Sequence, residues 1–125
     1  MEYLLVALGG ALGATARYGL TTSPLFAGVE FPLGTLAVNI LGSFAIGLIA
    51  GFAGRSRFIS PDMRVFLQVG ICGGFTTFSS FSLEVFSLMS QQKYLNATGY
   101  VVVSVVGCVV GVMLGDLLSR ALVGE

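Results

Sequence analysis

Hydroxyl and phenyl side chains occupy eight consecutive residues after a glycine pair in the middle of an apolar stretch, and no other part of this sequence is so well suited to chemistry. Residues 73–82 read Gly-Gly-Phe-Thr-Thr-Phe-Ser-Ser-Phe-Ser. A glycine pair loosens a helix. Polar or broken backbone at membrane depth is tolerated only where it is buried in protein or lines a cavity. The segment therefore predicts a broken helix beside a narrow, selective path through a membrane.

Polar side chains at helical spacing lie in two further apolar stretches. Thr35 and Asn39 are four residues apart, and Tyr100, Ser104 and Cys108 follow one another at the same interval, so each set shares one helix face. A serine or threonine hydroxyl can instead bond the carbonyl four residues earlier, which is the structural alternative to a functional role. The amide of Asn39 has two donors and an acceptor that no local bond satisfies together. We therefore expect a functional or interface role for Asn39.

These groups suit an anion better than a cation. Hydroxyls and an amide donate hydrogen bonds, and the ring edges of Phe78 and Phe81 carry the positive side of the aromatic quadrupole. No carboxylate lies among them, since Glu84 is the only acid well inside the third apolar stretch and Asp116 the only one late in the fourth. Arg17, near the end of the first stretch, either attracts anions at an entrance or anchors the helix at the membrane interface.

Four apolar stretches must position these residues, and together they predict an all-α membrane protein whose third helix is broken near its middle. They cover roughly residues 3–20, 33–52, 63–89 and 96–122, and each reaches the ~20 residues that a helix needs to cross the hydrocarbon core. The connections are too short for a soluble domain. Residues 1–125 are therefore expected to form a single integral membrane domain.

Composition excludes most soluble functions. The chain is 55% hydrophobic and 10% charged, with a mean hydropathy of +0.95, whereas soluble proteins average about 25% charged residues. The formal net charge is zero, which makes nucleic acid an unlikely partner. The sequence has no histidine, the commonest general base and metal ligand, so we do not expect an enzyme.

Glycines four residues apart predict where the helices meet, because small residues on one face let backbones approach closely in lipid. Such pairs occur in three of the stretches, as Gly9 with Gly13, Gly47 with Gly51, and Gly107 with Gly111 and Gly115. Packing inside one subunit is the simpler interpretation. A subunit interface is the alternative for the long strip in the fourth stretch.

Three motifs resemble the Fluc (CrcB-type) fluoride channels. They are Gly-Gly-Ala-Leu-Gly-Ala-Thr-Ala-Arg-Tyr at residues 9–18, Thr-Leu-Ala-Val-Asn-Ile-Leu-Gly-Ser-Phe at residues 35–44, and the segment 73–82. The resemblance covers nearly the whole chain, including its length, the number of spans and the order of the motifs. Composition and spacing alone would stop at a small anion-permeable or transporter-like membrane protein.

The resemblance implies an antiparallel, dual-topology homodimer with two fluoride pathways. Such a channel would passively export cytoplasmic fluoride across the plasma membrane, which would be a bacterial inner membrane. By this likeness Asn39 would donate to fluoride, and Phe78 and Phe81 would present their ring edges to it. A track of hydroxyls would continue the path through Ser79 or Ser80, Thr35, Tyr100 and Ser104. Cys108 stands at a place where the family often has a hydroxyl.

The same resemblance implies a structural sodium ion at the centre of the dimer. Its ligands would be the main-chain carbonyls of Gly73 and Thr76 from both subunits. Carbonyl oxygens suit a hard monovalent cation, and an unwound helical turn leaves them free.

A small dual-topology multidrug or guanidinium exporter is the alternative in a different class of protein. Such an exporter also has four spans, but it needs a glutamate in the middle of its first span. Here that span has no acid after Glu2, which counts against the exporter.

The basic residues near the span ends are almost balanced between the two sides of the membrane. One side would carry Arg55, Arg57, Arg64 and Arg120, and the other Arg17 and Lys93. Because Lys and Arg near span ends set orientation, this weak bias permits insertion both ways up.

Overall fold

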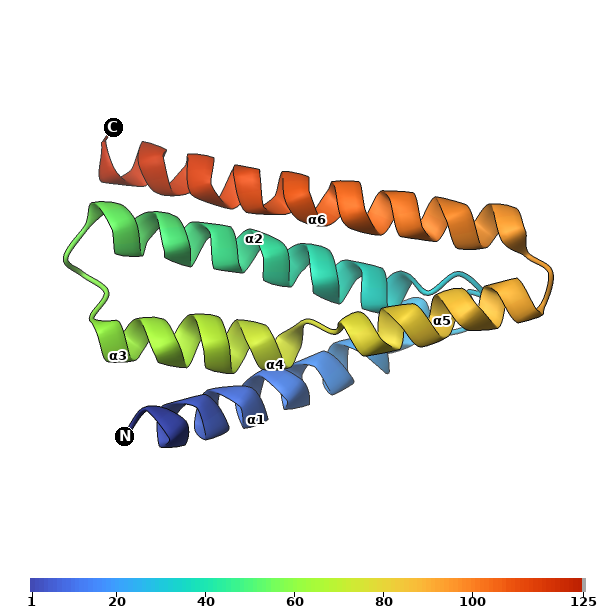
Figure 1. Cartoon of the computed structure of the whole chain (residues 1–125), viewed down its shortest axis with the longest axis horizontal. Helices are drawn as coiled ribbons and strands as arrows, with labels where there is room; N and C mark the ends of the chain where they lie inside the picture. Colours follow the sequence, from blue (N-terminus) through green and yellow to red (C-terminus); the bar gives the residue numbers. More distant parts are fainter. Residues whose placement is uncertain (125) are drawn as a thin grey trace.

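Four long helical segments lie side by side in the computed structural model, which describes residues 1–124 (Figure 1). All four are long and apolar enough to cross a membrane, which confirms the predicted all-helical membrane fold. The first, second and fourth are the continuous helices α1 (Glu2–Thr21), α2 (Leu33–Arg55) and α6 (Tyr94–Val123). A short 3₁₀ turn, η1 (Pro24–Phe26), lies in the first connection. Both termini and the connection after α2 lie at the same end of the bundle (Figure 1).

The third span, Pro61–Ser90, is built from four pieces. They are α3 (Pro61–Arg64), the π-helix η2 (Val65–Cys72), α4 (Gly73–Phe75) and α5 (Phe78–Ser90). The span begins at a capped turn, where the Ser60 hydroxyl accepts a hydrogen bond of 3.2 Å from the Met63 N–H. It breaks only at residues 76–77, where both residues are extended. π-Helical turns are rare and often accompany functional sites.

The expected cause of the break was wrong. Gly73 is helical, with φ −63° and ψ −39°, and α4 includes Gly74 as well. Gly74 packs so closely on α1 that a Cβ there would lie 2.5 Å from the carbonyl oxygen of Gly10. Gly74 therefore allows close packing, while Thr76 and Thr77 carry the break.

The repeated glycines pack helices together inside one subunit. A Cβ on Gly9 would lie 2.6 Å from the Phe66 carbonyl oxygen, and a Cβ on Gly47 would lie 2.8 Å from the Val112 Cα. From the other side, a Cβ on Gly115 would lie 2.6 Å from the backbone nitrogen of Leu48. Contacts of α1 with η2 and of α2 with α6 therefore account for the glycine strips, including the one proposed as a subunit interface.

Apolar side chains cover the outside of the bundle. The fully buried side chains are few, and the largest are Tyr100 and Val38. Exposed valines, leucines and methionines run along α6 from Val102 to Leu122. This arrangement suits a protein whose surroundings are lipid tails, because burying apolar groups brings little gain there.

Candidate functional site

The break in the third span is held open by one side chain of α2. The Asn39 Nδ2 donates to the Thr77 carbonyl oxygen at 3.0 Å, and the Thr77 N–H donates to the Asn39 Oδ1 at 2.8 Å. The side-chain amide thus pairs with a main-chain peptide as a second strand would, and it replaces the helical bonds that Thr77 does not make. Asn39 keeps a second N–H that has no partner among residues 1–124.

Thr77 also starts the second half of the span. Its hydroxyl oxygen accepts a hydrogen bond from the Ser80 N–H at 3.2 Å, and Thr77 itself is 7% exposed. Its Oγ1 lies 3.1 Å from the Ser80 Oγ and 3.4 Å from the Ser79 Oγ. The two serines proposed for the hydroxyl track therefore gather around the cap of α5, with Ser80 more buried than Ser79.

A cavity of about 450 Å³ lies beside the break and brings most of the predicted site together. Its lining comes from α2, from both halves of the third span and from α6. Of the predicted residues it includes Asn39, Gly73, Thr76, Phe78, Phe81 and Ser104, and also Cys108. None of the residues that line it is an acid, a lysine or an arginine.

Two phenylalanines form one side of this cavity but differ in burial. The ring centroids of Phe78 and Phe81 are 5.4 Å apart, and that of Phe81 is 5.0 Å from the Tyr100 ring. Phe81 is 8% exposed, whereas Phe78 is 78% exposed. A single subunit therefore leaves one ring of the pair outside its own packing.

Two buried polar atoms in the cavity lining have no hydrogen-bond partner among the described residues. They are the Ser104 Oγ and the Gln68 Nε2. Ser104 was expected at the site, but Gln68 was not. The signal that singled out Asn39, a primary amide inside an apolar span, applies to Gln68 equally and would have found it.

Thr35 and Tyr100, both proposed for the hydroxyl track, bind a carboxylate instead of lining the cavity. The Thr35 hydroxyl donates to the Glu84 Oε1 and the Tyr100 hydroxyl to the Glu84 Oε2, each at 2.7 Å. Two donors thus satisfy the acid that lies deepest in the third span. Their contribution to ion passage stays a prediction.

Arg17 lies against the break. Its Nη1 donates to the Thr76 carbonyl oxygen at 3.4 Å, and the side chain is half-buried. The guanidinium therefore contacts the break, and its role as an entrance cation or an interface anchor stays a prediction.

The main-chain oxygens at the break are the groups that could hold a cation. Among residues 1–124 no group of three His, Cys, Asp or Glu side chains is placed to bind a metal ion. The Thr77 N–H, which would continue the helix by bonding the Gly73 carbonyl, donates to Asn39 instead. Gly73 is exposed, so a second subunit could reach this residue.

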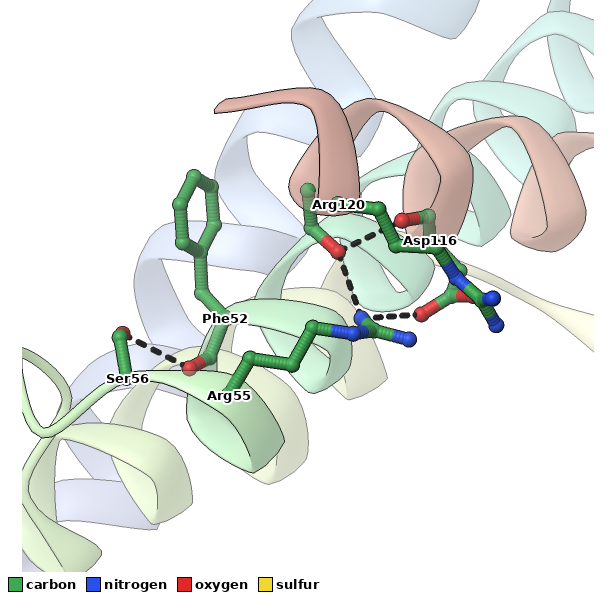
Figure 2. Close-up of polar contacts among 6 residues, drawn as sticks. Phe52, Arg55, Ser56, Asp116 and Arg120 are labelled. Carbon is green, nitrogen blue, oxygen red and sulfur yellow. Dashed lines mark hydrogen bonds and ion pairs between the residues drawn. The ribbon is translucent and has the colours of Figure 1, made fainter. Parts of the chain in front are cut away.

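A second polar cluster joins the C-terminal ends of α2 and α6 (Figure 2). The Arg55 Nη1 lies 2.6 Å from the Asp116 Oδ1 and 2.9 Å from the Ser119 Oγ, while the Arg120 Nη2 lies 2.9 Å from the Asp116 Oδ2. Both carboxylate oxygens of Asp116 are therefore paired. A hollow of about 350 Å³ next to the cluster is lined mainly by glycine, alanine and valine.

Comparisons with known proteins agree with the sequence motifs. The family model for CrcB-like protein, Camphor Resistance (CrcB), matches residues 4–116. A protein of Rhodospirillum rubrum is 52% identical over 122 residues, covering 94% of this chain and 93% of its own length. One of Anaeromyxobacter sp. strain K is 46% identical, covering 97% of each. Both are named fluoride-specific ion channel FluC. Together with the four spans, these relatives establish an integral membrane protein that is not an enzyme.

Proposed function

The chain belongs to the CrcB-like (Fluc) family, and we propose that it is a fluoride-selective ion channel through which cytoplasmic fluoride leaves the cell passively. The small multidrug or guanidinium exporter is not favoured, because the relatives are named ion channels. The proposed channel is an antiparallel homodimer with a structural sodium ion at its centre.

The observation that carries this proposal is the cavity at the break. It combines two phenyl rings with polar atoms from three spans, and its lining holds neither an acid nor a basic side chain. An anion that leaves water must exchange its hydration for other donors. The free N–H of Asn39, the hydroxyl of Ser104 and the ring edges of Phe78 and Phe81 are groups of that kind.

Passive transport follows from the chemistry of the lining. Coupling to protons requires a group that takes up and releases them at physiological pH, and carboxylates and histidines are the usual ones. The cavity lining contains none of these. Fluoride would therefore move down its own electrochemical gradient, and outward once it has accumulated inside.

A dimer would complete the site that one subunit leaves open. Phe78 lines the cavity and is 78% exposed, and Gly73 beside it is exposed as well. A second copy packed over this face would enclose both. An antiparallel arrangement would bring the two breaks together, and the near-balance of basic residues permits subunits to insert in both orientations.

The sodium ion would bind to main-chain oxygens at this junction. The Gly73 carbonyl lacks the helical bond from Thr77, and the Thr76 carbonyl accepts only the 3.4 Å bond from Arg17, so each has a lone pair available. Two such oxygens from each subunit are a donor set that suits a hard monovalent cation. Binding there would stabilise the paired breaks.

Flux measurements on purified protein in liposomes test the function directly. Vesicles loaded with fluoride should empty quickly when valinomycin and potassium clamp the membrane potential, while vesicles loaded with chloride should stay full. Efflux that requires a proton gradient would contradict a passive channel, and equal loss of both anions would contradict fluoride selectivity.

A further inference from the structure

We propose that Gln68 binds fluoride inside the channel as a hydrogen-bond donor. Gln68 lies in η2, before the break, and acts together with Ser104 of α6. This inference rests on the proposed function. It assigns a donor to the half of the cavity that lies along η2, where the resemblance to the family placed none.

The orientation of the Gln68 amide is fixed by a neighbour. The Arg64 Nε donates to the Gln68 Oε1 at 3.1 Å. A guanidinium has donors only, so the atom facing it must be the amide oxygen and the NH₂ must point the other way. This contact assigns the oxygen and the nitrogen of the amide.

Gln68 lines the cavity, and its NH₂ group has no hydrogen-bond partner among the described residues. Its Nε2 is buried and makes no hydrogen bond within residues 1–124, and Gln68 is part of the cavity lining. A buried polar group in this state costs free energy unless a ligand or a water binds it. The arrangement therefore indicates a bound species that accepts hydrogen bonds.

Ser104, on α6, also lacks a hydrogen-bond partner in the part of the chain that the structure describes. It is 5% exposed, lines the same cavity and has an unpartnered hydroxyl. Nearby, the Thr76 hydroxyl donates to the Cys72 carbonyl, and Asn39 uses one N–H for Thr77 and keeps the other. The Gln68 Nε2 and the Ser104 Oγ are the two fully buried polar side-chain atoms of the lining that have no partner among residues 1–124.

The chemistry at Gln68 and Ser104 favours an anion over a cation. An NH₂ group can only donate, and the lining contains no carboxylate to receive a cation. Ordered water is the other species that could satisfy both groups. Bound fluoride and bound water can be told apart by experiment, because changing Gln68 lowers fluoride flux only if Gln68 contacts the ion.

The main test compares Gln68→Met with wild type in the liposome assay. Methionine keeps the length of the side chain and removes both donors. Losing a hydrogen bond to a charged group should lower fluoride efflux roughly tenfold or more, while size exclusion shows an unchanged assembly. Gln91→Met is the matched control, because Gln91 is exposed at the end of α5 and bonds only Ser87. It should conduct like wild type.

A double variant with Ser104→Ala shows whether the two residues serve one ion. If both bind the same fluoride, the combined loss should be clearly smaller than the product of the two single losses. If the flux loss of the double variant equals the product of the two single losses, the residues act independently and the shared site is wrong. Should Gln68→Met fail to assemble, Gln68→Asn keeps an amide with a shorter reach and should still lose flux.

The outcomes separate this inference from the function on which it rests. If the wild-type protein conducts fluoride and the Gln68 variants conduct equally well, Gln68 binds only water and the inference is wrong. If the wild-type protein passes no fluoride, the proposed function itself fails. Reduced flux in the Gln68 variants, with unchanged flux for Gln91→Met, supports both.

Discussion

The two polar clusters of this protein differ in how completely their groups are paired. At the ends of α2 and α6, Arg55, Asp116 and Arg120 carry full charges, and Asp116 binds both arginines (Figure 2). Beside the break the groups are neutral, yet Gln68 and Ser104 each have a buried polar atom with no partner among residues 1–124. The more strongly polar cluster is thus the satisfied one.

This difference suggests separate tasks for the two places. Charges that are paired at a half-exposed helix end contribute modestly to stability and are screened by water. Neutral donors left unpaired in a buried cavity cost free energy until something binds them. We therefore expect changes at the break to affect ion flux and changes at the charged cluster to affect stability.

The largest effect is expected for Asn39→Ala. This change removes a donor from the cavity and also both bonds that hold the Thr77 peptide, each of which is worth about 1–3 kcal/mol when its partner is left buried. Fluoride efflux from liposomes should fall by roughly a hundredfold or more.

Asn96→Ala is the control for that change, because Asn96 is exposed near the start of α6. It should conduct normally. An Asn39→Ala protein with wild-type flux would mean that the amide only shapes the helix. The cluster at the break would then not differ from the charged cluster in its effect on ion flux.

The phenyl rings should come next, with flux reduced about tenfold in Phe78→Ile and in Phe81→Ile, because an aliphatic side chain has no positive ring edge. Phe86→Ile is the matched control, since Phe86 is also on α5, is 67% exposed and does not line the cavity. Efflux assays should be read beside size-exclusion profiles. Normal flux in Phe78→Ile would reduce Phe78 to a lipid-facing or packing residue.

Gly73→Leu should weaken dimer assembly with little strain inside the subunit. A Cβ at Gly73 would meet only the Gln68 carbonyl oxygen, at 3.8 Å, so the first carbon of the new side chain fits inside the subunit. Gly19→Leu, where a Cβ meets nothing within 4 Å, is the control. Size exclusion and cross-linking measure the result, and a dimer as stable as wild type would argue against a junction at Gly73.

The smallest effect on transport is expected for Asp116→Asn. The change leaves Arg55 and Arg120 without the carboxylate that they share, so the midpoint of thermal unfolding in detergent should drop by a few degrees. Fluoride flux should stay at the wild-type level. A marked loss of flux at unchanged stability would show that the charged cluster belongs to the conduction path.

Hydropathy was sufficient to predict the four spans. Helical spacing grouped Asn39 with Thr35 and Ser104 with Tyr100, and only the resemblance to the family put Asn39 and Ser104 on one pathway. The end of α2 was predicted at residue 52, whereas the helix continues to Arg55, which contacts Asp116 across the bundle. No local pattern reveals such a partner.

The position of the break and the partners of Glu84 could not be predicted for the same reason. The break is at Thr76 and Thr77 because Asn39, distant in sequence, takes the bonds of Thr77. Thr35 and Tyr100 reach Glu84 from two other helices. Ser82, by contrast, bonds the carbonyl of Phe78 four residues earlier, which is the local alternative that sequence reasoning does foresee.

The two halves of the third span belong to different neighbours. The half before the break packs through glycines on α1, where Gly70 and Gly74 meet Gly9 and Gly10. The half after it packs through Phe81 on Tyr100 of α6. Residues 76–77 are thus a joint between two bodies, and the cavity lies along their seam. A rotation of one body against the other would concentrate at that joint and would change the width of the cavity.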